Sequence, residues 1–147
     1  MIFVREAKEQ DFPFVTALIK NELGYPDLDE AEVYNRLKLF NDDDNWITLV
    51  AVDNDEIIGF IGVMKGVTYS IEGYYSQIMA LAVSNNYRRS GVGTMLIRSA
   101  EEWSTSNEIT SIGVNCNLKR IESHAFYEKN GYIKRSYSFY KNLQDHY

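Results

Sequence analysis

The chain has 147 residues, of which 45% are hydrophobic and 24% are charged, and its formal net charge is -6. This length predicts one globular domain over residues 1–147, and the composition excludes a wholly disordered chain. The longest apolar run, Ile78 to Val83, is far too short to span a bilayer, so no membrane partner is expected. Basic residues form only short clusters in an acidic chain, which argues against a nucleic-acid partner.

Cysteine usage sets a further limit. Cys116 is the only cysteine, so no disulfide within the chain and no cysteine-based metal site can form. A lone thiol is typical of a reducing compartment, and we expect a cytoplasmic protein.

Two helices are expected early in the chain, after a short strand at residues 2–5. The first follows Asp11, which is expected to be its N-cap, and carries apolar residues at helical spacing up to Gly24. The second begins near Asp29 and ends in the polar loop 41–45.

Three strands are expected in the middle of the chain. Residues 46–52 and 57–67 are rich in β-branched and apolar residues, and the turn sequence 53–55 between them predicts a hairpin. Residues 74–83 end almost wholly apolar, as expected of a strand that is covered on both faces.

Helices and strands alternate in the second half. After a helix that follows residues 87–93, we expect a strand at 109–116, a helix at 119–130 and a last strand at 132–143. The order β-α-α-β-β-β-α-β-α-β predicts an α/β (α+β) fold with helices on both faces of a mixed sheet.

The sharpest local signal is the sequence Arg88-Arg89-Ser90-Gly91-Val92-Gly93, between a buried strand and an amphipathic helix. Its two glycines allow a tight turn and a close approach of the backbone to a ligand. The helix that begins there offers free N–H groups and a positive dipole end, which make an anion site that suits a pyrophosphate. The sequence lacks the Gly-Lys-Ser/Thr of a P-loop and the third glycine of a dinucleotide fingerprint.

A second motif runs from Arg120 through Ser123-His124-Ala125-Phe126-Tyr127-Glu128 to a closing Gly131. By composition alone, a tyrosine such as Tyr127 is more often a packing residue than a catalyst.

Together the two motifs resemble the GNAT superfamily of acyl-CoA-dependent N-acetyltransferases, in its small bacterial-type members. The resemblance implies a mostly antiparallel sheet splayed at its centre, acetyl-CoA as cosubstrate and no metal. In the family, the glycine loop cradles the CoA pyrophosphate and the splayed strand holds the pantetheine arm. The cofactor-binding residues implied are Leu81, Ala82, Val83, Arg88, Arg89, Ser90, Gly91, Val92, Gly93, Thr94 and Arg120.

The chemistry implied is transfer of an acetyl group to a primary amine of a small molecule or peptide, by direct attack in a ternary complex. We expect the Tyr127 hydroxyl to protonate the leaving thiolate as general acid, and a main-chain N–H near Leu81 to stabilise the oxyanion. Histone-type members carry a glutamate base where this chain has Gln77, which cannot ionise. Glu72 is the candidate base, and an ordinary solvated glutamate is the alternative.

Two other functions compete with this hypothesis. The absence of a glutamate at Gln77 motivates a non-catalytic acyl-CoA-binding sensor or scaffold. A nucleophilic hydrolase is disfavoured because the chain has two histidines and no Gly-x-Ser-x-Gly elbow.

The acceptor and the assembly are the least defined features. In the family, the acceptor lies over the first two helices and the loop after the third strand. Carboxylates there would hold the ammonium groups of a polyamine or aminoglycoside, or would merely solvate the surface, and tyrosines would form an aromatic wall. The carboxylates are Asp27, Asp29, Glu30, Asp42, Asp43, Asp44 and Glu72, and the tyrosines are Tyr25, Tyr34, Tyr69, Tyr74 and Tyr75.

Alternating aromatic residues in 132–143 predict a strand that helps to form a homodimer, with a plain sheet edge as the alternative.

Overall fold

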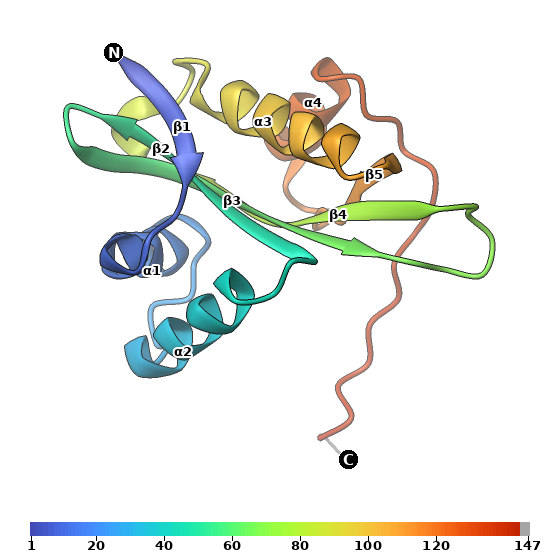
Figure 1. Cartoon of the computed structure of the whole chain (residues 1–147), viewed down its shortest axis with the longest axis horizontal. Helices are drawn as coiled ribbons and strands as arrows, with labels where there is room; N and C mark the ends of the chain where they lie inside the picture. The colour runs from blue at the N-terminus through green and yellow to red at the C-terminus, as the bar shows by residue number, and fades with distance from the viewer. Residues whose placement is uncertain (145–147) are drawn as a thin grey trace. The chain divides into compact units, whose positions relative to one another are not determined.

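The computed structural model describes residues 1–144, and the chain divides into two compact units, Met1–Val114 and a second that begins at Asn115. The first unit is built on a five-stranded sheet of order β1-β2-β3-β4-β5, in which neighbours are antiparallel except for the parallel pair β4–β5 (Figure 1). Its strands are β1 (Ile2–Glu6), β2 (Trp46–Asp53), β3 (Glu56–Gly66), β4 (Tyr74–Val83) and β5 (Ile109–Val114). Its helices are α1 (Phe12–Glu22), α2 (Glu30–Asn41) and α3 (Val92–Ser106), with short 3-10 helices η1 (Glu9–Asp11) and η2 (Asn85–Tyr87).

Helices cover both faces of this sheet, as the sequence predicts (Figure 1). On one face, α1 and α2 pack on β2 and β3 in a core that includes Val15, Leu37, Val50 and Phe60. On the other face, α3 lies so close to β3 that a Cβ at Gly59 would stand 3.2 Å from Leu96 Cδ1. Among residues 1–144, no helix is long and apolar enough to cross a membrane.

The parallel pairing of β4 with β5 ends halfway along β4. It runs from Tyr74 to Ile78, and from Ala80 to Val83 the strand pairs with β3 alone. Met79 has no partner on β3, because the register shifts there by one residue in a β-bulge. The predicted splay at the centre of the sheet is therefore present, and it leaves backbone groups of the second half of β4 without a strand partner in residues 1–114.

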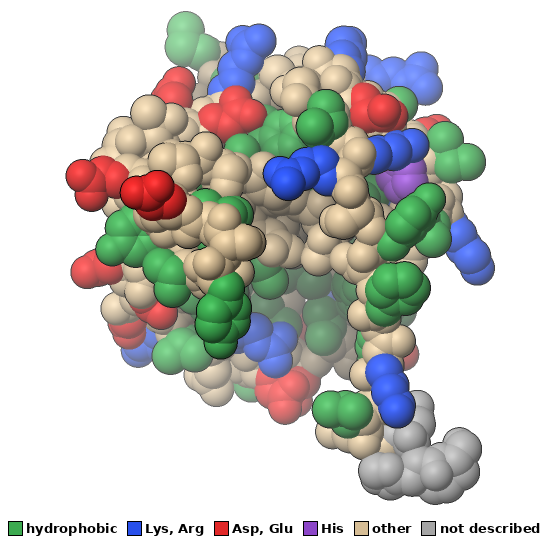
Figure 2. Space-filling view, turned by 90° about the vertical axis from the view of Figure 1, so that its right-hand side faces the viewer, with side chains coloured by type: hydrophobic (Ala, Val, Ile, Leu, Met, Phe, Trp, Pro, Cys, Tyr) green, Lys and Arg blue, Asp and Glu red, His purple; other side chains and the backbone are tan. Residues whose placement is uncertain are grey.

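The second unit contains α4 (Ile121–Lys129), which the sequence predicts within 119–130. The prediction of a last strand at 132–143 is wrong, because the structure has no strand in 132–144. Ile133, Tyr137 and Phe139 are 77%, 79% and 96% exposed, and Figure 2 shows hydrophobic side chains along the stretch that leads to the C-terminus. Residues with this aromatic pattern form a strand only where a neighbouring strand pairs with their backbone groups. The described residues of the second unit contain no such strand.

Asp11 does not cap α1 with its side chain as predicted. Its buried carboxylate accepts two hydrogen bonds from Arg5, at 2.6 and 3.1 Å, and one from the backbone N–H of Lys8 at 2.8 Å. The hydrogen bond from Arg5 is the main cause that holds the pKa of Asp11 below its ordinary value. Asp11 thus ties β1 to the start of α1.

We expect Asp11→Asn to lower the free energy of unfolding by about 2 kcal/mol, because it removes the charge that accepts hydrogen bonds in a partly buried ion pair. Since the pKa of Asp11 is lowered in the folded state, this stabilisation is present above the ordinary aspartate pKa and is lost as the pH falls. Urea unfolding at neutral and acidic pH measures both effects. Glu9→Gln breaks an exposed pair with Lys38 and is the control with little expected change; an equal loss in both variants would contradict the prediction.

Candidate active site

The loop after η2 has the geometry of an anion site. Arg89 and Gly91 have positive φ angles of 65° and 87°, so the chain turns sharply before α3 begins at Val92. The first N–H group of the helix that donates a hydrogen bond is that of Met95, and its acceptor is the carbonyl oxygen of Gly91 at 3.0 Å. Among the described residues, the N–H groups of Val92, Gly93 and Thr94 therefore have no acceptor, and no side chain caps the helix.

The loop is held by three contacts that sequence reasoning missed. The Tyr87 hydroxyl donates to Asp53 at 2.9 Å, and this hydrogen bond raises the pKa of Tyr87. The Arg88 guanidinium donates to the carboxylate of Glu22 on α1 at 2.9 Å. The hydroxyl of Ser90 also donates to the carbonyl oxygen of Tyr87. The first two contacts join residues far apart in sequence, so no local sequence pattern predicts them.

The open half of β4 leads directly into this loop. Leu81, Ala82 and Val83 pair with Ile61, Phe60 and Gly59 of β3, and the Ser84 N–H donates to the Ile58 carbonyl oxygen at 2.8 Å. Two predicted parts of a cofactor site, the splayed strand and the glycine loop, are thus brought together within one unit.

Tyr127 lies on α4 in the second unit, where its ring packs edge-on against Phe126 and Tyr132 at centroid distances of 5.3 and 5.8 Å. Burial, and then the electrostatic interaction with Cys116, raise the pKa of Tyr127 to about 12, against the opposing effect of Arg120. Among residues 1–144, its hydroxyl has no hydrogen-bond partner. The group is therefore protonated at neutral pH and available to a ligand. Arg120 is exposed at the N-cap of α4.

Glu72 is not brought to the splay. It is exposed on the loop between β3 and β4, before the first residue of β4, Tyr74. Tyr74 and Leu81 are separated by about 23 Å of strand at about 3.3 Å per residue. Gln77 lies between Met64 of β3 and Gly113 of β5 in the paired half of β4.

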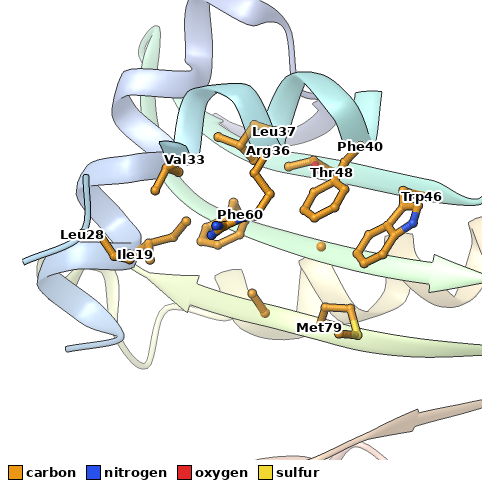
Figure 3. A pocket seen from close by; sticks show the side chains of 12 residues that line it. Ile19, Leu28, Val33, Arg36, Leu37, Phe40, Trp46, Thr48, Phe60 and Met79 are labelled. Atoms are coloured by element: carbon orange, nitrogen blue, oxygen red, sulfur yellow. The ribbon is translucent and has the colours of Figure 1, made fainter. Parts of the chain in front are cut away.

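An apolar pocket of about 110 Å³ lies between α2, the end of α1 and the sheet (Figure 3). Its floor includes the cross-strand row Thr48, Gly62 and Ala80, in which the missing side chain of Gly62 leaves open space. The bulge residue Met79 also lines the pocket, next to Ala80, which directly precedes Leu81. The pocket thus ends against the open half of β4.

The pocket differs from the predicted acceptor surface. None of the seven carboxylate residues predicted there lines it, and neither does any of the five tyrosines. Its aromatic walls are Phe40, Trp46 and Phe60, and the one charged lining residue is Arg36. No group of three or more His, Cys, Asp or Glu side chains in the described part of the chain could hold a metal ion.

Comparison with known proteins gives one consistent relationship. The chain is 28% identical over 144 residues to an aminoalkylphosphonate N-acetyltransferase of Salmonella typhimurium, covering 95% of this chain and 90% of that protein. The structure of a GNAT family acetyltransferase from Staphylococcus aureus is 28% identical, with a TM-score of 0.79 over 97% of this chain and 98% of that one.

The structure of AAC(6′)-Iy with the bisubstrate analogue CoA-S-monomethyl-acetylneamine is 15% identical. Its TM-score is 0.86, over 97% of this chain and 98% of that one. The model of the acetyltransferase (GNAT) family matches residues 4–132. With the fold, the glycine loop and these relatives in agreement, the chain belongs to the GNAT family and is an N-acetyltransferase.

Proposed function

We propose that this enzyme moves an acetyl group from acetyl-CoA to the primary amine of a small molecule, with the two units acting as one domain. The observation that carries the proposal is the uncapped N-terminus of α3 next to the open half of β4. Its free N–H groups suit the CoA pyrophosphate, and the open strand suits the pantetheine arm. A match of the family model across both units, and a related fold solved with a CoA analogue, support this assignment.

The residues would divide the reaction as follows. The amine nitrogen attacks the thioester carbonyl carbon, a main-chain N–H near Leu81 stabilises the oxyanion, and the carbon–sulfur bond then breaks. Tyr127 gives its proton to the leaving thiolate, consistent with its raised pKa, and the proton that the amine nitrogen loses passes through solvent water and restores the hydroxyl. Arg120 contacts a CoA phosphate. Glu72 stays a prediction as base; from the loop before β4 it would take the proton through water rather than directly from the amine.

The two cationic side chains of the loop differ in what they can contribute. Arg88 is already paired with Glu22, whereas the described residues offer Arg89 no ion pair. We therefore assign to Arg89 the larger part of the charge that would face the pyrophosphate, and to Arg88 the role of fixing the loop. Pyrophosphate binding then rests mainly on the N–H groups of Gly91 to Thr94 and on Arg89.

Thermal melting with and without acetyl-CoA, followed by thiol release with a panel of amines, tests the proposal. A ligand of the folded state must raise the melting temperature by mass action. We expect a clear shift, and thiol release with at least one small amine. A shift without release from any amine would favour an acyl-CoA sensor, and the absence of a shift at saturating acetyl-CoA would overturn the assignment.

The acceptor is assigned to the pocket between α2 and the sheet. The relatives are named for acetylating an aminoalkylphosphonate and for binding an acetylneamine analogue, and both names indicate amine acceptors. The pocket is small and apolar, and it ends beside Leu81, where the acetyl group would lie.

Gly62→Val tests this pocket, because a Cβ at Gly62 meets no atom within 4 Å and a β-branched residue suits a strand. We expect the KM for the amine to rise at least about tenfold as the pocket fills, a loss of about 1.4 kcal/mol in binding. The melting shift with acetyl-CoA should stay the same. Gly113→Val on β5, equally open, is the matched control. An unchanged amine KM in Gly62→Val would place the acceptor elsewhere.

Assembly and location follow as further proposals. The exposed aromatic residues of 132–144 would be covered in a homodimer. Light scattering, which measures the molar mass in solution, can detect such a dimer. The single cysteine supports a cytoplasmic location.

A further inference from the structure

Arg36 is the one charged side chain among the twelve residues that line the pocket. It stands on α2 between Val33 and Leu37, two residues of the buried face. Figure 3 shows its side chain running from the helix toward the sheet. The guanidinium therefore enters a space whose other walls are almost entirely apolar.

Arg36 has no ion pair or hydrogen bond with any residue in 1–144, although a partner stands within reach in sequence. Glu32 lies four residues earlier on the same helix, the spacing and order that favour a surface ion pair. The neighbouring cations on these helices are paired, Lys20 with Glu30 and Lys38 with Glu9. Arg36 makes no such pair with Glu32 and lines the pocket instead.

An unpaired guanidinium against apolar walls favours an anion in the same space. Its planar fork can bind a carboxylate or phosphonate through two parallel hydrogen bonds, and these strengthen where water is excluded. The hydroxyl of Thr48, also in the lining, has no hydrogen bond with the described residues and can add a donor. Arg36 stays exposed over part of its surface, so a ligand can reach it from solvent.

We propose that the acceptor is a short primary amine that also carries an anionic group, which Arg36 binds while the amine points toward Met79 and Ala80. This inference rests on the proposed acetyl transfer and names its substrate class. Arg36 at one wall and β4 at the other set the two ends of the substrate. The polyamine and aminoglycoside acceptors expected from the surface carboxylates are cations, which Arg36 repels.

Four amines of similar length test the charge preference: 2-aminoethylphosphonate, β-alanine, neutral n-propylamine and dicationic putrescine. Thiol release with acetyl-CoA gives kcat/KM for each. We expect the two anionic amines to exceed n-propylamine by at least about tenfold, the value of one charge-assisted contact. Putrescine should be the poorest. A preference for n-propylamine or putrescine would overturn the inference and leave the acetyl transfer standing.

Variants then assign the preference to Arg36. We expect Arg36→Met to raise the KM for 2-aminoethylphosphonate at least about tenfold, with kcat/KM for n-propylamine and the melting shift with acetyl-CoA unchanged. Arg36→Lys should restore part of the preference, because it keeps the charge without the fork. Arg98→Met, an exposed arginine of α3, is the matched control.

A direct binding measurement separates this inference from the proposed function. The melting shift caused by 2-aminoethylphosphonate, with coenzyme A present, should be lost in Arg36→Met and kept in Arg98→Met. Equal shifts in the wild type and Arg36→Met would overturn the role of Arg36. If acetyl-CoA itself gives no shift and no amine releases thiol, the proposed function fails, and the inference that rests on it fails too.

Discussion

Gly91→Glu is expected to abolish acetyl-CoA binding. The backbone of Gly91 has φ of 87° and directly precedes the free N–H groups of α3. A glutamate there places a carboxylate at the helix N-terminus, where it satisfies those N–H groups itself and repels the pyrophosphate. Electrostatic repulsion and lost hydrogen bonds act together, so the melting shift with acetyl-CoA should disappear.

The fold should survive this substitution. A Cβ at Gly91 meets no atom within 4 Å, so the penalty is the left-handed backbone, about 1 to 2 kcal/mol. Gly91→Ala carries the same strain without the charge and should keep most acetyl-CoA binding. Gly73→Glu adds the same residue at φ of 80°, also in open space, on the loop before β4. Gly73→Glu should therefore keep the wild-type melting shift with acetyl-CoA. If Gly91→Glu keeps that shift as well, the loop does not hold the pyrophosphate.

Local chemistry explains why the glycine loop could be predicted. The positive φ at Gly91 and the start of α3 at Val92 are consequences of residues within a few positions of each other. The same holds for the strands around the turn 53–55, since Asn54 and Asp55 adopt φ of 50° and 64°. In such patterns, the residues that determine the local structure are neighbours in the sequence. The order of elements up to α4 could therefore be predicted from the sequence.

Long-range contacts could not be predicted in this way. The pairs Arg88–Glu22 and Tyr87–Asp53 depend on how α1 and the β2–β3 hairpin meet the loop. The missing strand in 132–144 shows the same limit, because alternation describes a strand only when a partner edge is present. The surface carboxylates predicted to hold the acceptor do not line the pocket, because a helix has two faces and α2 turns Val33, Arg36, Leu37 and Phe40 toward it.

The position of Arg36 in the sequence of α2 carries a signal of its own. It lies three residues after Val33 and four before Phe40, a spacing that places it on the apolar face of α2. A charged residue at such a position either reaches solvent with its long side chain or serves a ligand. The choice between these outcomes needed the structure, which shows the side chain directed into the pocket.

Tyr127→Phe is expected to lower kcat about 100-fold, the lower end of what a positioned general acid contributes, with acetyl-CoA binding unchanged. The substitution keeps the aromatic contacts with Phe126 and Tyr132 and removes a hydroxyl that has no hydrogen bond with the described residues. The melting temperature should therefore change little. Tyr137→Phe, at a tyrosine that is 79% exposed, is the control that should keep full activity.

The pH dependence separates an acid from a packing residue. The pKa of Tyr127 is raised to about 12, so its hydroxyl keeps its proton throughout the neutral and mildly basic range. Because the folded-state pKa is the higher one, the proton on Tyr127 stabilises the fold fully below the ordinary tyrosine pKa, and this stabilisation is lost as the pH rises from there through about 12. Any limb of the kcat profile below pH 11 or so then belongs to another group. It should appear at the same pH in Tyr127→Phe, on a curve lowered as a whole. If Tyr127→Phe has the kcat of the wild type at every pH, its hydroxyl does not protonate the thiolate. If only the KM for acetyl-CoA rises and kcat stays constant, Tyr127 is a binding residue.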